Sequence, residues 1–187
     1  MATRAGAARP VRAGLLILIT TLLSIPQSVS AQTPWELAAG YAYLQDPPDR
    51  LDFPSGWIAS AAVGLTSWLS AVADVSRHSH STLAIDFSTL ALVGGVRASA
   101  RIGRLTEFGQ IGVGLARSTS TVVGISSTAH AVAIQPGAGL DYPLGPRFAA
   151  RLQIDYRAIR GGIEAPIADP RHQFRYAAEL VYRGRRR

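Results

Sequence analysis

Apolar and polar residues alternate along residues 147–160, which read RFAARLQIDYRAIR, most strictly over residues 150–157. Leu152 and Ile154 lie on one side of this alternation, and Arg151 and Asp155 lie on the other. A period of two residues is typical of a β-strand whose two faces meet different surroundings. The same period recurs along most of the chain after residue 31, where helical periodicity is almost absent. The sequence therefore predicts an all-β protein.

Eight segments carry this period, and the connections between them alternate between short and long. The predicted strands span 35–45, 56–66, 68–77, 88–101, 106–117, 128–141, 147–157 and 172–183. Short connections lie around Ser67, at 102–105 and at 142–146; the longer ones read QDPPDRLDFPS, RHSHSTLAIDFS, RSTSTVVGISSTA and AIRGGIEAPIADPRH. Outer-membrane barrels have this asymmetry between their two ends. The pattern predicts an eight-stranded antiparallel up-and-down transmembrane β-barrel with a lumen filled by side chains.

Aromatic residues bracket three of the predicted strands at one spacing. The two members of each pair are eight residues apart on the apolar face: Trp35 with Tyr43, Phe148 with Tyr156, and Phe174 with Tyr182. At about 3.3 Å per residue and a tilt of roughly 40°, eight residues span roughly 20 Å of membrane normal. The apolar band of a transmembrane barrel is about 25 Å tall, with aromatic residues at both edges. Together with Trp57 and Tyr142, these six residues are the predicted membrane-interface aromatics.

The opposite face of the predicted strands carries charges of both signs. Aligning the aromatic pairs of the last two strands places Arg151 opposite Glu179 and Asp155 opposite Arg175. Both are opposite-charge pairs, as groups removed from water require. The predicted lumen charge network comprises Glu36, Asp74, Arg97, Asp141, Arg151, Asp155, Arg175 and Glu179.

Two glycines are expected to make room for these long side chains. A tight turn before residue 147 predicts that Gly139 lies near Arg151 and Gly137 near Gln153.

The energetics favour a barrel whose apolar face contacts the hydrocarbon chains of the membrane. A register slip of one residue exchanges the two faces of a strand. Each arginine then exposed to lipid near the bilayer centre would cost about 2–4 kcal/mol, so several together would offset a domain stability of about 5–15 kcal/mol. A soluble, lipocalin-like carrier of a small apolar ligand is the competing interpretation; it would turn Leu152, Ile154 and Leu180 inward.

The first 31 residues are predicted to be a secretory signal peptide that is cleaved after Ala31. Arg4, Arg9 and Arg12 form a basic head, and residues 13–25 are an apolar run. This run is shorter than the roughly 20 residues of a membrane-spanning helix. Residues 32–187 would then form the barrel domain, with a short basic C-terminal tail.

The formal charge of +7 is concentrated at the two ends of the chain. Between residues 32 and 182 there are twelve arginines and twelve acidic residues, and the chain ends in RGRRR. A nucleic-acid partner would require a basic face instead of a basic end, so none is expected. The chain has no cysteine, so its stability depends on burial and backbone pairing.

Several segments resemble, in order, the small outer-membrane β-barrel domain family of the porin-like and OmpA-type superfamily. In GWIASAAVGLTSWLSAVADVSRH, a strand rich in small residues precedes a tight turn, Trp68-Leu69 and the inward acid Asp74. The segments ALVGGVRASAR, TEFGQIGVGLARS, AIQPGAGLDYPL and RLQIDYRAIR follow the same pattern. The resemblance implies insertion into a Gram-negative-type outer membrane by the barrel assembly machinery, with outer-membrane lipids as partners. It implies no particular activity.

The sequence departs from that family at two positions. The chain continues past Tyr182, whereas family barrels usually end on an aromatic residue that serves as an assembly signal. Pro136 lies inside the sixth predicted strand, where its missing N–H removes a ladder hydrogen bond. We expect a bulge or a local irregularity there.

Candidate chemistry is confined to the segment RHSHSTLAIDFS. His78 and His80 share one face, a spacing that can hold a metal, but the sequence supplies no third ligand and favours a solvated loop. Ser79, Ser81 and Asp86 complete the residue types of a lipid-modifying hydrolase, which needs a nucleophile and a base within hydrogen-bond reach. The sequence instead favours a monomeric barrel with a structural or surface-interaction role, without enzymatic activity, cofactor or open pore.

Overall fold

The computed structural model describes residues 35–47, 51–81, 85–122, 125–162 and 171–184. The predicted signal peptide and the arginines that follow Gly184 lie outside these described residues. Among the described residues, no helix has the length and apolar character needed to cross a membrane.

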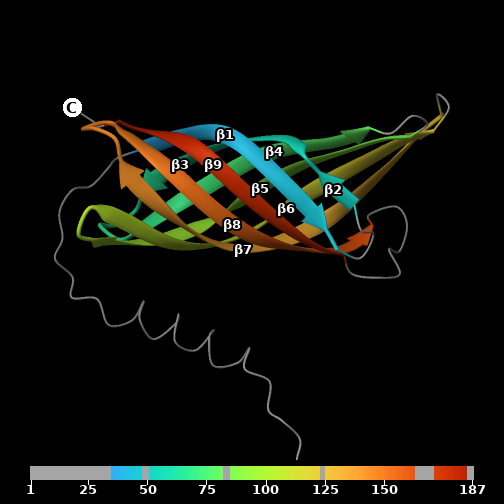
Figure 1. Cartoon of the computed structure of the whole chain (residues 1–187). Helices are drawn as coiled ribbons and strands as arrows, with labels where there is room; N and C mark the ends of the chain where they lie inside the picture. Colours follow the sequence, from blue (N-terminus) through green and yellow to red (C-terminus); the bar gives the residue numbers. More distant parts are fainter. Residues whose placement is uncertain (1–34, 48–50, 82–84, 123–124, 163–170, 185–187) are drawn as a thin grey trace, which may run out of the picture.

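The chain forms one closed antiparallel sheet, which confirms the predicted eight-stranded up-and-down transmembrane β-barrel (Figure 1). Neighbouring strands in the sheet are neighbours in sequence, and β1 closes the barrel by pairing with β9 from Trp35↔Gly184 to Gln45↔Phe174. The strands are β1 (Trp35–Asp46), β2 (Leu51–Phe53), β3 (Ser55–Gly64), β4 (Leu69–Ser81), β5 (Ile85–Ile102), β6 (Leu105–Val122), β7 (Ile125–Pro143), β8 (Phe148–Gly162) and β9 (Arg171–Gly184).

The short β2 is an extension of β3 and does not add a ninth strand to the circumference of the barrel. Both pair with β1, β2 through Leu44↔Phe53 and β3 through Tyr41↔Trp57. Pro54 separates them and cannot donate to the ladder. This arrangement brings part of the predicted long connection QDPPDRLDFPS into the sheet.

Two other predicted loops are wrong over most of their length, because all of their described residues belong to strands. β4 runs to Ser81 and β5 begins at Ile85; β6 runs to Val122 and β7 begins at Ile125. The β4–β5 and β6–β7 hairpins therefore project beyond the rest of the barrel at one end (Figure 1). Hydroxyl pairs hold the β6–β7 projection together: Thr119 Oγ1 lies 3.3 Å from Thr128 Oγ1, and Thr121 Oγ1 lies 2.9 Å from Ser126 Oγ. We call this the hairpin end, and the opposite one the turn end.

The β7–β8 ladder is interrupted at Gln135 and Pro136, which have no ladder partner on β8, so the local irregularity expected at Pro136 is present, whereas the bulge lies several residues away. The register between β7 and β8 shifts between Ala131 and Val132. Ile134↔Ala158 and Gly137↔Asp155 belong to a single register, so no residue is inserted at Pro136 itself. Pro136 tolerates its position because its exposed ring points away from the lumen while β7 still pairs with β6.

The two faces of the wall have opposite chemistry. The outward positions carry exposed apolar side chains, among them Leu152 at 65% and Leu92 at 60% relative exposure. The inward positions carry buried polar and charged groups, including Arg151, Asp155 and Arg175. Because Leu152, Ile154 and Leu180 all face outward, the soluble carrier with an apolar lumen is wrong.

Candidate functional site

The lumen of the barrel is filled by a network of ion pairs, and all eight predicted lumen residues face it. At the turn end, the Glu36 carboxylate lies 2.6 Å from Arg97 Nη1 and 2.8 Å from Arg151 Nη2. Arg151 also donates to both oxygens of Asp141, at 2.7 and 2.8 Å. Arg183 enters from the last strand and places Nη2 2.5 Å from Asp141 Oδ2. Two acids and three arginines from five strands therefore pair with one another at this end of the lumen.

A second cluster lies nearer the middle of the barrel and is centred on Arg175. Its guanidinium lies 2.8 Å from Asp155 Oδ2 and 3.0 Å from Asp74 Oδ1, and it donates to Ser76 Oγ at 3.0 Å. Asp155 and Arg175 are also partners in the β8–β9 register, as the sequence predicts. Asp74 comes from β4 on a different part of the wall, so Arg175 joins strands that are not neighbours.

Glutamine side chains connect these clusters and extend them toward the hairpin end. Gln110 Oε1 accepts from Arg97 at 2.8 and 3.0 Å, while its Nε2 donates to Asp155 Oδ1 at 3.0 Å. Gln135 accepts from Arg157 Nε at 2.9 Å. Arg157 is completely buried and also reaches Ser76 Oγ at 3.2 Å. The polar network is thus continuous over most of the lumen.

One predicted ion pair does not form. Arg151 and Glu179 are register partners, but Arg151 directs its guanidinium to Asp141 and Glu36. Glu179 instead accepts a hydrogen bond from Ser60 at 3.4 Å. The two-donor geometry that Arg151 makes with Asp141 explains this choice, since a bidentate guanidinium–carboxylate pair is stronger than a single contact.

The predicted neighbours of the two inward glycines are wrong by two residues along β8. Gly139 lies opposite Gln153 and Gly137 opposite Asp155, because the β7–β8 register pairs Asp141 with Arg151. The expected reason for the glycines nevertheless holds at Gly137, where an added Cβ would lie 2.0 Å from Asp155 Oδ1.

The sequence interpretation missed several lumen groups. Phe108 is buried beneath two guanidinium groups, with Arg97 4.4 Å and Arg151 4.8 Å from its ring centroid, which is cation–π geometry. The period of two residues along β6 predicts that Phe108 and Gln110 face the lumen. Neither was included in the predicted network because that network was chosen by charge, and neither side chain is charged. Other missed members of the network include Ser76, Gln135, Gln153, Arg157 and Arg183.

The predicted interface aromatics lie on the outer surface in two groups. At the turn end, the Tyr182 ring lies 5.6 Å from Trp35 and 5.3 Å from Phe148, centroid to centroid. Nearer the hairpin end, Tyr156 lies 5.4 Å from Phe174. The remaining members are Tyr43, which contacts Tyr176, and the exposed Trp57 and Tyr142. The strand register sets Phe148 opposite Tyr182 and Tyr156 opposite Phe174, as predicted.

The residues considered for hydrolysis are not assembled into a catalytic set. His78 is completely buried on the lumen side, whereas the adjacent Ser79 faces outward and donates to the Ser55 carbonyl at 3.4 Å. Ser81 and Asp86 are exposed, and the ring of His80 packs near Phe53. Within the described ranges, no three His, Cys, Asp or Glu residues are grouped so that they could hold a metal ion.

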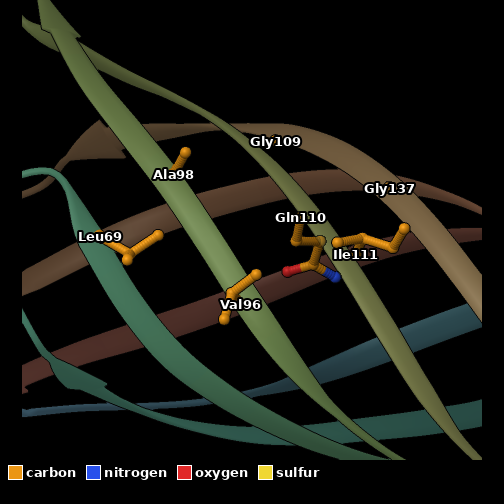
Figure 2. A pocket seen from close by; sticks show the side chains of 7 residues that line it. All are labelled: Leu69, Val96, Ala98, Gly109, Gln110, Ile111 and Gly137. Atoms are coloured by element: carbon orange, nitrogen blue, oxygen red, sulfur yellow. The ribbon is translucent and has the colours of Figure 1, made fainter.

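A shallow hollow lies on the outer surface at a place where several side chains are small or absent. Figure 2 shows Val96 and Ile111 on β5 and β6 beside Ala98 and Gly109. An added Cβ at Gly109 would meet no atom within 4 Å. The hollow belongs to the apolar face and is lined by Leu69, Val96, Ala98, Gly109, Gln110, Ile111 and Gly137.

Comparison with solved structures identifies barrels of the same fold. Neisserial surface protein A (NspA) matches with a TM-score of 0.65 at 12% identity, over 80% of this chain and 96% of NspA. Ail, the attachment invasion locus protein of Yersinia pestis, matches with a TM-score of 0.52 at 14% identity, over 79% of this chain and 97% of Ail. The N-terminal β-barrel domain of Pseudomonas aeruginosa OprF matches with a TM-score of 0.51 at 11% identity, over 79% and 97% respectively.

Sequence comparison finds no such relatives. No protein-family model matches the chain, and no curated protein sequence is significantly similar to it. The likeness to the solved barrels is therefore a likeness of fold.

Proposed function

We propose that this protein is a monomeric outer-membrane barrel with a structural or surface-interaction role and a closed lumen. The observation that carries the proposal is the ion-paired network, which joins strands that are not neighbours in the sheet. Arg151 bonds Glu36 across 115 residues of sequence, and Arg175 bonds Asp74 across 101. An open pore would leave such groups facing water instead of each other.

The energetics of the network support a plug instead of an ion path. A permeating ion would have to separate guanidinium–carboxylate pairs whose side chains are at most a few per cent exposed, such as Arg175 with Asp155. Breaking one buried pair typically costs about 3–5 kcal/mol. Because the two clusters lie one after the other along the lumen, an ion would have to pass both. Eight-stranded barrels are narrow enough for side chains to fill them.

The proposed location follows from the apolar outer face and its two aromatic groups. The hairpin end would project from the cell surface, since the longer connections of outer-membrane barrels lie outside. One barrel of the same fold is named an attachment invasion locus protein, which supports a surface-interaction role for such a scaffold. We assign no catalytic residue and no cofactor; insertion would depend on the barrel assembly machinery.

Fractionation and electrical recording together test the proposal. The protein should occur in the outer-membrane fraction and migrate differently on a gel before and after heating, as folded barrels do. In a planar bilayer it should give no resolvable conductance steps, with a large-pore porin in the same bilayer as the positive control. A soluble product without a mobility shift would contradict the membrane location, whereas stable conductance steps would contradict the closed lumen.

A further inference from the structure

Basic side chains form an arc on the outer surface, at the edge of the apolar band that lies nearer the hairpin end. Arg77 on β4 lies opposite Leu90 on β5, which lies opposite Arg117 on β6. Arg117 in turn lies opposite His130 on β7. Arg160 on β8 lies opposite Val132, one outward position nearer the turn end than His130, and continues the arc diagonally. The three arginines and His130 all have outward parity. Their side chains are exposed, except that of His130, which is partly exposed. We call Arg77, Arg117, His130 and Arg160 the cationic arc.

The arc separates two surfaces of different chemistry. The next outward positions toward the turn end are apolar: Leu92 at 60%, Leu115 at 53% and Val132 at 41% relative exposure. The next outward positions toward the hairpin end carry hydroxyl groups, namely Ser79, Ser88, Thr119 and Thr128. A molecule that fits this surface is apolar at one end and anionic at the other.

The positive charge of the arc is not neutralised within the part of the chain that the structure describes. Arg77, Arg117 and Arg160 make no ion pair there, in contrast to the paired arginines of the lumen. On β3 and β1, the outward positions in register with Arg77 are Trp57 and Tyr41, so the basic residues do not continue onto these two strands. A general interfacial belt of basic residues would include these strands as well.

We propose that the cationic arc binds the headgroup of a membrane lipid that carries two phosphate groups, with its acyl chains on the Leu92–Leu115–Val132 surface. Arginine pairs well with phosphate because its planar donors match two oxygens at once. Strands lie about 4.8 Å apart, so Arg77 and Arg117 are separated by about 10 Å. One phosphate is placed at Arg77, and the other is placed between Arg117, His130 and Arg160. The proposal goes beyond the barrel's proposed role but rests on its membrane location.

Binding of fluorescent diphosphoryl lipid A to the purified, detergent-solubilised full chain tests the proposal. Arg117→Gln removes one charged contact and should weaken binding about tenfold, since one charge-assisted contact contributes about that factor. Monophosphoryl lipid A should bind the wild-type protein about tenfold more weakly than the diphosphoryl form. Higher salt should reduce the wild-type affinity, because screening acts on exposed charges.

A matched variant separates a site from general attraction to positive charge. Arg104→Gln also removes one exposed arginine, but in the tight turn at the opposite end, and should leave the affinity unchanged. Inorganic pyrophosphate should compete poorly if the acyl surface contributes; complete competition would assign the arc to free phosphate and overturn the lipid assignment. An equal loss in both arginine variants, or no preference for two phosphates, would also overturn it.

Folding of each variant is checked by its gel mobility shift. If Arg117→Gln does not fold, Arg77→Gln gives the same test from a different strand. Because the mobility shift and the absence of conductance are measured separately, lipid binding can fail while the proposed closed barrel stands, and the reverse outcome is equally visible.

Discussion

Replacing Arg175 with methionine should test whether the lumen network holds the barrel together. The Arg175 side chain is completely buried and makes ion pairs with both Asp155 and Asp74, as well as a hydrogen bond to Ser76. Methionine keeps much of the length of the side chain but removes its charge and its donors. Two carboxylates then lose their main cationic partner inside a lumen closed to water.

The structure allows the magnitude to be bounded. Asp155 keeps amide donors from Gln110 at 3.0 Å and Gln153 at 2.9 Å, whereas Asp74 keeps a hydrogen bond from Gln135 at 3.3 Å. Removing one member of a buried ion pair costs about 3–5 kcal/mol. Because the remaining donors are neutral, Arg175→Met should lower the free energy of unfolding by at least that amount. That loss is a large part of a typical domain stability of about 5–15 kcal/mol.

Urea titration in lipid vesicles measures the loss, with the folded fraction taken from gel mobility before heating. Adding Asp155→Asn to Arg175→Met should recover part of the stability, since it removes one of the uncompensated charges; the two changes should be coupled by about 0.5–3 kcal/mol. Arg104→Met, on an exposed turn, is the matched control and should cause no measurable change. A loss below about 1 kcal/mol for Arg175→Met would refute the reasoning, because the carboxylates would then be solvated or protonated at little cost.

The remaining predictions concern the lipid face and the packing of the wall, and the same urea titration measures both. Leu152 is 65% exposed and midway between the aromatic groups, so Leu152→Arg should cost about 2–4 kcal/mol in lipid, while Leu152→Asn should cost less; equal losses would place this face in water. Gly114→Ala should cost about 1–3 kcal/mol, because its Cβ would lie 1.9 Å from the Leu92 carbonyl oxygen, whereas Gly109→Ala on the same strand meets no atom within 4 Å and should be tolerated.

The register of the last two strands shows how much local pattern can determine. Two aromatic pairs of equal spacing, read together with period-two alternation, placed Phe148 opposite Tyr182 and therefore Asp155 opposite Arg175. Both pairings occur in the structure. The β7–β8 register lacked such markers on both strands, and its prediction was displaced by two residues, which preserves the face but changes every partner.

Strand length was less predictable than strand position. Serine and threonine are frequent in turns because their hydroxyls bond to nearby backbone, so RSTSTVVGISSTA was interpreted as a loop. In the structure the same hydroxyls pair across β6 and β7, as in Thr121 with Ser126. Whether such a residue bonds to its own backbone or to the opposite strand depends on the presence of that strand.

The sequence by itself determined that the wall has two unlike faces, how many strands build it, and which charges point inward, because side-chain direction in a strand follows from residue parity alone. Only the tertiary structure decided which inward charges meet. Arg151 bonds Asp141, its register partner on β7, instead of Glu179, its register partner on β9. It also reaches Glu36 on β1, which is 115 residues away in the chain. The guanidinium of a long arginine side chain can reach several strands of a narrow barrel. Its partner therefore depends on closure of the sheet, which the sequence of one strand does not predict.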